Sequence, residues 1–389
     1  MTAPPTRPIL PPATIGILGG GQLGRMLGLA ARAMGYRIAI LDPDPDCPAA
    51  AVADRVVAGA YDDADAAREL AGVSAVITYE LEHVALEVVR AACETVPVRP
   101  GLEPLRVTQD RLAERRFVEA AGIAVAPWRA VATDDDLREA AADLGLPLRL
   151  KAVTGGYDGR SQVRVVSADE VGTAFERLGR PSGEAALAEA ELPFDAELSA
   201  IAVRALDGTV RVFPPARNVH DAGILVESVA PADLPDLAIE HAAAIVTTLA
   251  EAMELVGTLT AELFLLPDGR LVVNELAPRV HNSGHWTIEG AATSQFEQHV
   301  RAICGLPLGR TDAARPTAIV NILGSGPSRP ARLEGIDAVL GDPDLHVHLY
   351  DKRLVFERRK MGHVSASGGT AAEALDRARA ARDALHWTA

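Results

Sequence analysis

The stretch that decides the fold is residues 271–286, which read LVVNELAPRVHNSGHW. Its first three residues, LVV, are aliphatic or β-branched and lead through Asn274 to a carboxylate, Glu275, so they predict a strand with an acid at its end. The residues that follow interrupt the strand and are polar, and they include Arg279, His281 and Asn282. The stretch therefore predicts a strand that delivers an acid to an anion-binding cluster.

A second strand-like run, residues 258–264, lies ahead of it and carries Glu262 among apolar neighbours. Residues 266–270 (LPDGR) predict a tight turn between the runs, because Pro presets φ and Gly accepts positive φ. Such a hairpin places Glu262 beside Glu275. Adjacent carboxylates repel unless a cation lies between them, and oxygen ligands suit a Mg²⁺ that bridges nucleotide phosphates. The alternative is a hairpin with two surface acids that bind nothing.

Composition sets the outer limits. With 389 residues, 48% hydrophobic and 23% charged, the chain is long enough for two or three globular domains. The net charge of −15 argues against general binding to nucleic acid or to anionic membranes. No apolar run approaches the roughly 20 residues that span a bilayer. Residues 1–12 are Pro-rich and predict a flexible extension, not a signal peptide, and the scattered Cys47, Cys93 and Cys304 suit a reducing, cytoplasmic setting.

The N-terminal region has the order of a Rossmann-like unit. Residues 14–18 predict a buried strand, GGGQLG follows at 19–24, a helix runs to about Met34, and a strand at 37–41 precedes Asp42. The glycine spacing and the acid formally complete a dinucleotide fingerprint. Glycines also let backbone N–H groups approach any phosphate at a helix N-terminus. The residues alone thus leave open a nicotinamide cofactor, another phosphorylated ligand, or close packing.

A further acid, Glu80, follows the predicted strand 75–79. A carboxylate just past the carboxyl end of a parallel strand lies where open sheets bind ligands. The alternative is an acid that the dipole of a following helix favours.

The middle of the chain predicts a charge-rich helical region at 105–121 and a strand at 148–151. The strand leads into residues 154–162 (TGGYDGRSQ), a glycine-rich flap whose backbone can close on phosphates. The spacing is not that of a Walker loop, and a plain glycine hairpin is the alternative. Residues 218–221 predict a polar insertion, and short strands are expected after Arg310.

Together, residues 19–24, 151–162, Glu262 and 274–286 resemble the ATP-grasp ligases, and more closely the N5-carboxyaminoimidazole ribonucleotide synthase family of purine biosynthesis. The likeness runs from about Thr14 to about Val364. GGGQLG is a weak motif alone, TGGYDGR is stronger, and NELAPRVHNSGHWT is the most specific.

The resemblance implies a mixed α/β and α+β fold. It implies a flexible extension at 1–12, a Rossmann-like pre-ATP-grasp substrate domain at 13–105, a two-lobed ATP-grasp domain at 106–310 and a small β-rich C-terminal domain at 311–389.

The implied reaction is the ATP- and bicarbonate-dependent carboxylation of the exocyclic amine of 5-aminoimidazole ribonucleotide. It passes through carboxyphosphate and releases ADP and phosphate. The implied cofactors are ATP and Mg²⁺, the implied assembly is a homodimer, and no nucleic-acid or membrane partner is implied.

The resemblance also implies roles for individual residues. The ATP-binding set is Arg106, Lys151, Gly156, Tyr157, Asp158, Gly159, Arg160, Ser161, Gln162, Glu189, Ala190, Glu191, Leu192, Glu197, His220, Asn274 and Glu275. The metal ligands are Glu262 and Glu275. The residues facing the aminoimidazole ribonucleotide are Gln22, Leu23, Glu80, Asn282, Lys352, Arg359 and Lys360. Arg279 and His281 face bicarbonate and carboxyphosphate, and with Lys151 they form the catalytic set.

The chain departs from the family pattern at three places. Ser161 stands where the flap more usually has Gly, Ala190-Glu191 fills a hinge segment that is often Glu followed by an apolar residue, and Arg217 stands where His is common. None of these positions belongs to the metal pair or the substrate cluster.

Two other functions remain to be weighed. A formate-dependent glycinamide ribonucleotide transformylase shares the scaffold, but an acid is expected there at position 282, where this chain has Asn282. A nicotinamide-dependent dehydrogenase would use GGGQLG and Asp42, and it would leave Glu262, Glu275 and TGGYDGR without a role.

Overall fold

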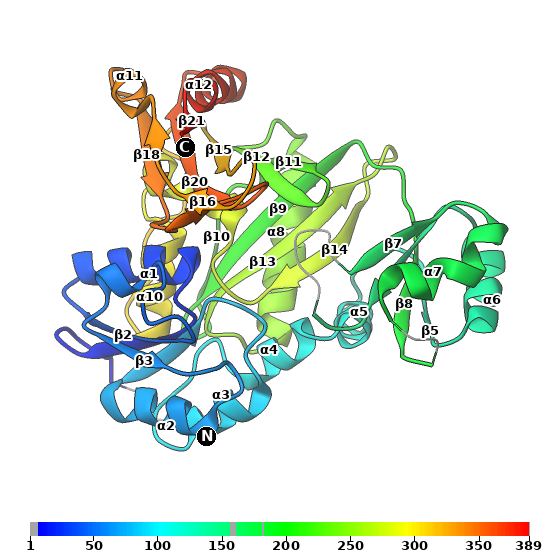
Figure 1. The fold of residues 1–389 in the computed structure, drawn as a ribbon, viewed down its shortest axis with the longest axis horizontal. Helices are drawn as coiled ribbons and strands as arrows, with labels where there is room; N and C mark the ends of the chain where they lie inside the picture. The colour runs from blue at the N-terminus through cyan, green and yellow to red at the C-terminus, as the bar shows by residue number, and fades with distance from the viewer. Residues whose placement is uncertain (1–6, 156–160, 181–182, 389) are drawn as a thin grey trace.

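A computed structural model describes residues 7–155, 161–180 and 183–388. Figure 1 shows an N-terminal α/β unit, a large central sheet, and a small sheet with two helices that projects away from both. The mixed fold class is the predicted one, whereas the predicted domain boundaries remain predictions. Within the described residues, no helix is long and apolar enough to cross a membrane.

The N-terminal unit is a parallel four-stranded sheet in the order β3-β2-β1-β4 with helices packed on it. Its elements are β1 (Thr14–Leu18), α1 (Gln22–Ala33), β2 (Arg37–Asp42), η1 (Ala50–Val52), β3 (Arg55–Ala58), α2 (Ala64–Val73), β4 (Val76–Tyr79) and α3 (Leu86–Cys93). Parallel pairing brings the carboxyl ends of β1, β2 and β4 to one edge, so the glycine-rich turn, Asp42 and Glu80 meet there.

The predicted helical region at 105–121 is confirmed for most of its length, but it divides into two helices, α4 (Leu102–Thr108) and α5 (Arg111–Ala120). Asp110 separates them, since its carboxylate accepts a hydrogen bond of 2.8 Å from the Ala113 N–H and caps α5.

The small sheet is antiparallel in the order β5-β8-β6-β7 and is covered by two helices. Its apolar core lies between strands and helices and includes Leu148, Leu150 and Phe175. The elements are β5 (Trp128–Val131), α6 (Asp134–Leu144), β6 (Leu148–Ala152), β7 (Gln162–Val165), η2 (Ala168–Glu170), α7 (Val171–Leu178) and β8 (Ala186–Ala190).

The large sheet has the order β14-β13-β9-β11-β12-β15-β20-β18, and β10 pairs with β9. Its strands are β9 (Ala196–Arg204), β10 (Val210–Val212), β11 (Ala216–Asp221), β12 (Ile224–Ala230), β13 (Gly257–Leu265), β14 (Leu271–Ala277), β15 (Thr317–Leu323), β18 (Leu345–Leu349) and β20 (Lys360–Ser367). The predicted polar insertion at 218–221 is therefore wrong, because these residues belong to β11. The Asn218 side chain is satisfied within the sheet by Ser199 and Ser228.

The short strands expected after Arg310 extend this sheet, because β12 pairs with β15 and β15 with β20. The helices around the sheet are α8 (Asp236–Ala252), η3 (Asn282–Gly284), α9 (Thr287–Gly290), α10 (Gln295–Ile303), α11 (Ile336–Val339) and α12 (Ala371–Asp383). The remaining short strands are β16 (Arg329–Pro330), β17 (Leu333–Glu334), β19 (Leu354–Val355) and β21 (His386–Trp387).

Candidate active site

Glu262 and Glu275 are direct partners in the antiparallel β13–β14 ladder, as the hairpin predicts. The turn closes through the Leu266 N–H, which donates to the Arg270 carbonyl at 2.9 Å. The register shifts next to this pair, since Leu263 pairs with Val273, so Asn274 is an extra, bulged residue.

The bulge places the Asn274 amide with the two acids. Its Nδ2 lies 3.4 Å from Oε2 of Glu262, and opposed residues of a ladder share one face. The strand also continues two residues past Glu275 to Ala277, so the acid lies within β14 instead of ending it.

Burial raises the pKa of Glu262 to about 7, with the charge of Glu275 adding to the rise and that of His220 opposing it. Two carboxylates on one face form a pair of hard oxygen donors, and a cation between them would offset the burial of Glu262 and its repulsion from Glu275. The residues present therefore fit Mg²⁺. Among the described residues, no cluster of three or more acidic, His or Cys side chains forms a complete metal site, so other oxygens would have to fill the shell.

Polar partners surround the acid pair. Nδ1 of His220 lies 2.8 Å from Oε2 of Glu197, and Nε2 of His281 lies 3.5 Å from Oε1 of Glu262. Burial lowers the pKa of His220, but its bond to Glu197 and the charge of Glu262 outweigh this, so the net shift is upward. A small pocket between β9, β11, β13 and β14 is lined by Glu197, Leu198, Asn218, His220, Glu262, Leu263, Phe264 and Asn274.

His281 contacts Glu262, one of the residues that line this pocket, and Arg279 lies two residues before it in the chain. Burial holds the pKa of His281 well below its ordinary value, and the charge of Arg279 lowers it further, so the ring is neutral at neutral pH. Its Nδ1 lies 2.8 Å from the Ser283 hydroxyl oxygen. Arg279 reaches the N-terminal unit, where its Nε lies 2.8 Å from Oε1 of Glu82.

Lys151 on β6 donates from Nζ to Oε2 of Glu189 on β8 at 2.5 Å. The other oxygen of Glu189 accepts a bond of 2.7 Å from Nε of Arg115. Burial alone would raise the pKa of Glu189, but the charges of Lys151 and Arg115 outweigh burial and lower it. The predicted phosphate-binding lysine thus belongs to a buried ionic network.

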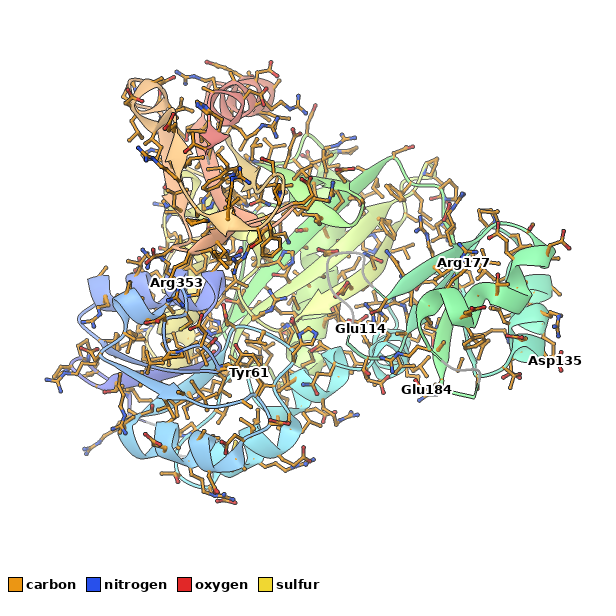
Figure 2. All side chains as sticks on the ribbon, viewed as in Figure 1. Tyr61, Glu114, Asp135, Arg177, Glu184 and Arg353 are labelled. Atoms are coloured by element: carbon orange, nitrogen blue, oxygen red, sulfur yellow. The ribbon has the colours of Figure 1, made fainter. Side chains whose placement is uncertain are left out.

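The sequence interpretation missed Arg115 and its neighbour Glu114, which are 1% and 2% exposed. Figure 2 shows Glu114 on α5, in the region between the large sheet and the small one. Spacing carried a signal for Arg115, because it lies three residues after Leu112 and three before Val118, which are both buried.

The other predicted ATP contacts that the structure describes have partners within the chain. Arg106 engages Glu103, one turn earlier on α4, at 2.8 Å. Glu191 pairs with Arg149 and Arg164, each at 2.8 Å. Ala190 pairs with Leu148 in the small sheet, and Leu192 packs against an apolar cluster of Ala126, Leu266 and Val272.

Of the flap, Gly156, Tyr157, Asp158, Gly159 and Arg160 lie outside the described residues. Ser161 has a φ of +61°, in the left-handed region that favours glycine. Its carbonyl accepts a bond of 3.0 Å from the Ala152 N–H, and Gln162 pairs with Lys151. The departure from Gly at Ser161 therefore falls where the backbone conformation favours Gly.

The glycine-rich turn binds carboxylates of the chain itself. The Gly20 N–H donates to Asp42 at 2.7 Å, and the hydroxyl of Tyr61, labelled in Figure 2, donates to the same oxygen at 2.6 Å. The Gly21 and Gly24 N–H groups both donate to Glu80, the latter at 2.5 Å. A dinucleotide would have to displace both acids, which argues against the dehydrogenase alternative.

Predicted substrate residues from distant parts of the chain meet near this turn. Oε1 of Gln22 lies 3.5 Å from Nζ of Lys352, and its Nε2 lies 3.5 Å from Nε2 of His285. Lys352 also donates to the Lys360 carbonyl at 2.5 Å. Asn282 is 6% exposed, and its amide nitrogen and oxygen lack a partner within the described residues, which fits a ligand contact.

Two predicted substrate residues, Leu23 and Arg359, have side chains that contact other parts of the chain. The Leu23 side chain is 8% exposed and packs in the N-terminal core, so its main chain is what remains for a ligand. Arg359 donates to the Leu354 carbonyl at 2.6 Å and lies over the Phe356 ring, 5.0 Å from its centroid.

Comparison with known families matches three consecutive parts of the chain. The ribonucleotide synthetase preATP-grasp domain matches residues 12–109, and the ATP-grasp domain matches residues 116–296. The phosphoribosylaminoimidazole carboxylase C-terminal domain matches residues 317–377. The fold and the acid pair thus belong to an ATP-grasp ligase.

The chain belongs to the N5-carboxyaminoimidazole ribonucleotide synthase family. It is 44% identical to the Brucella melitensis enzyme of that name, over 91% of this chain and 96% of that protein. It is 40% identical to the Bacillus subtilis enzyme, over 92% of each.

Solved structures give the same result. An ADP complex of an N5-carboxyaminoimidazole ribonucleotide synthetase superposes with a TM-score of 0.89 at 42% identity, covering 97% of this chain and 98% of that one. The Aspergillus clavatus enzyme in complex with ADP and 5-aminoimidazole ribonucleotide gives 0.86 at 30% identity, covering 96% and 98%.

Proposed function

We propose that the chain uses ATP and bicarbonate to carboxylate the exocyclic amine of 5-aminoimidazole ribonucleotide, and that it binds Mg²⁺ to do so. The observation that carries the proposal is the direct pairing of Glu262 with Glu275, beside Asn274 and His281. Membership of the family supports the substrates, since a relative has been solved with ADP and 5-aminoimidazole ribonucleotide bound.

In the first step, the γ-phosphoryl group of ATP passes to a bicarbonate oxygen and leaves ADP and carboxyphosphate. Lys151 and Arg279 supply positive charge for the phosphoryl and carboxylate oxygens. Mg²⁺, held by Glu262 and Glu275, would neutralise charge on the phosphate oxygens. The network that holds Lys151 leaves its ammonium little freedom, which is the preorganisation that charge stabilisation needs.

In the second step, the exocyclic amine forms a bond to the carboxyl carbon of carboxyphosphate, and phosphate leaves. The amine must lose a proton in this step. His281, which burial keeps neutral, is proposed to take this proton or to orient the group that takes it. His285 is the alternative for the same role, and burial, which lowers its pKa to about 3, makes it a weak base.

The residues proposed to hold the aminoimidazole ribonucleotide, with the last three as phosphate contacts, are Gln22, Leu23, Glu80, Asn282, Lys352, Arg359 and Lys360. The junction of Gln22 with Lys352 supports this, because it joins the N-terminal unit to the loop between β18 and β20. A ligand at this junction would contact Gln22 and Lys352, which are both predicted substrate residues.

The proposal also includes a cytoplasmic location and a homodimer. Three free cysteines, Cys47, Cys93 and Cys304, agree with a reducing compartment. The dimer rests on the family resemblance alone, and sedimentation velocity at micromolar concentration would test it.

The decisive experiment measures ADP release with ATP, Mg²⁺, bicarbonate and 5-aminoimidazole ribonucleotide. The proposal expects ADP release that requires all four. Release with formate and glycinamide ribonucleotide instead would move the chain to the transformylase class. Enhanced NADH fluorescence on mixing with the chain would favour the dehydrogenase, and the occupied glycine-rich turn predicts none.

A further inference from the structure

Arg115 on α5 is a buried cation whose guanidinium joins two parts of the nucleotide site. Its side chain is 1% exposed, and each of its three nitrogens donates a bond of 2.7 Å. The acceptors are Glu189 on β8, Glu114 beside it on α5, and the main-chain carbonyl of Asn274 on β14. One side chain thus ties the small sheet to the large one.

Glu114 adds a second link between α5 and β14. Its Oε1 binds Arg115, and its Oε2 accepts a bond of 2.9 Å from the Leu276 N–H. The pair therefore grips the main chain on either side of Glu275, at the Asn274 carbonyl and the Leu276 N–H. Because β14 ends the large sheet, these groups point away from its ladder with β13 and have no further strand of that sheet to bind.

The other end of the network reaches Lys151, which shares Glu189 with Arg115. Lys151 and Arg115 carry positive charge opposite Glu189 and Glu114 in a buried setting, where an unpaired ion is costly. Three acceptors in three directions require the planar fork of Arg, which the single ammonium of Lys cannot reproduce. The contacts thus run without a break from Lys151 to the backbone of Glu275.

We propose that Arg115 is a positioning residue that holds the Glu275 segment in register with Lys151. The metal acids and the phosphate-binding lysine then meet the same nucleotide. This inference rests on the proposed function. It adds Arg115 to the proposed nucleotide site, as a residue that acts through Glu189, Glu114 and β14.

The test compares Arg115→Lys with Arg116→Lys, since Arg116 is the next residue on α5 and is exposed. Calorimetry on the full chain measures the dissociation constant of ADP with and without Mg²⁺. The constant without Mg²⁺ divided by the constant with Mg²⁺ is the factor by which the metal strengthens ADP binding. This ratio reports how well the metal acids and the rest of the nucleotide site act together. Arg115→Lys is expected to reduce this ratio about tenfold, the size of effect seen for outer partners of metal ligands. Arg116→Lys should leave it unchanged.

A double-mutant cycle that combines Arg115→Lys with Glu275→Gln tests whether Arg115 affects Mg²⁺-dependent ADP binding through Glu275. If Arg115 acts through Glu275, Arg115→Lys should change the ratio no further once Glu275 is Gln. A purely structural role would lower the unfolding temperature while the ratio stays within about twofold of the unaltered value. That result would overturn the inference. So would a double variant in which the two substitutions change the ratio independently, by the product of their separate factors.

If Arg115→Lys does not fold, Glu114→Gln takes its place as the test substitution. The single amide oxygen of Gln can keep only one of the two bonds that Glu114 makes, so the ratio should again fall. An unchanged ratio in this variant counts against the inference.

The experiment uses ADP and Mg²⁺ alone, so it separates this inference from the proposed function. Mg²⁺-enhanced ADP binding without carboxylation would overturn the proposed reaction and leave the role of Arg115 standing. Normal carboxylation with an unchanged ratio in Arg115→Lys would overturn the inference alone. No enhancement of ADP binding by Mg²⁺ in the unaltered chain would overturn the inference and the proposed metal site together.

Discussion

Glu262 and Glu275 face each other across the β13–β14 ladder, and the bulged Asn274 reaches the same face with its amide 3.4 Å from Glu262. An uncompensated pair of this kind is unfavourable, because one carboxylate repels the other and burial disfavours the charge on Glu262.

The first prediction concerns this pair. Glu275→Gln should lower kcat by about 100-fold or more, because a charge that stabilises the phosphoryl transfer is lost. The fold should be retained, since Glu275 is exposed. The measurement is ADP release at saturating Mg²⁺. Asp268→Asn in the exposed turn of the same hairpin is the matched control, and wild-type activity in Glu275→Gln would show that the metal assignment is wrong.

The second prediction separates substrate binding from surface charge. Lys352→Met should raise the KM for aminoimidazole ribonucleotide about tenfold or more, because a charge-assisted bond contributes roughly 1.5–3 kcal/mol. The KM for ATP should stay nearly constant. Arg353→Met is the control, since Arg353 pairs with the exposed Asp44 and Asp46, and such surface pairs contribute about 0–1 kcal/mol. Equal effects of the two variants on the KM would remove Lys352 from the substrate site.

The third prediction uses the backbone of Ser161, whose φ is +61°. Stability should rank Gly at or above Ser, with Val below both, because a β-branched residue is a steric outlier at positive φ. The loss for Ser161→Val should be about 1–2 kcal/mol. Denaturant unfolding of the three chains measures the order. If Val matches Ser, the left-handed conformation at this residue is not the one in solution.

The fourth prediction concerns His299, a buried ring between two parts of the molecule. Its Nε2 lies 2.8 Å from the Thr78 hydroxyl, and its Nδ1 accepts from the Thr258 N–H at 3.2 Å. Burial lowers the pKa of His299 from 6.5 to about 3. The unfolded chain therefore takes up a proton first as the pH falls, so the contribution to stability is complete above pH 6.5 and is lost toward pH 3.

Replacing His299 with Gln should remove up to about 1.4 kcal/mol per pH unit from the slope of unfolding free energy against pH between 6 and 4. Urea unfolding across this range gives the slope. His241→Gln, at an exposed position on α8, should keep the slope of the unaltered chain. Identical slopes for the two variants would show that His299 does not stay neutral in the folded state.

The acid hairpin was predictable because its signals are local. Pro267 and Gly269 define the turn, and a known turn length fixes which residues face each other. The strands of the N-terminal unit were equally accessible, since buried parallel strands appear as continuous apolar runs, and β1 has the predicted bounds of Thr14 to Leu18.

The errors arose where distant partners decide the outcome. His220 and Asn218 look like loop residues in the sequence, but Glu197, Ser199 and Ser228 satisfy them inside the sheet. Asp42 completed a dinucleotide fingerprint on paper, whereas in the fold it binds the Gly20 N–H.

The network around Arg115 shows the same limit for the site. Adjacent charges such as Glu114 and Arg115 usually lie on the solvated face of a helix. Burial of both depends on acceptors more than 70 residues away, at Glu189 and Asn274. The spacing of Arg115 from apolar neighbours hinted at burial, but its partners could not be read from the sequence.

The continuity of the large sheet has a consequence for dissecting this chain. A fragment that stops before Thr317 would strip β15 from the flank of β12 and uncover the main-chain amides and carbonyls between Glu227 and Ala230. Such a bare flank recruits strands from other copies. The last fifth or so of the protein thus covers an edge of the sheet, and removing it would yield an aggregating fragment in place of an independent nucleotide-binding module.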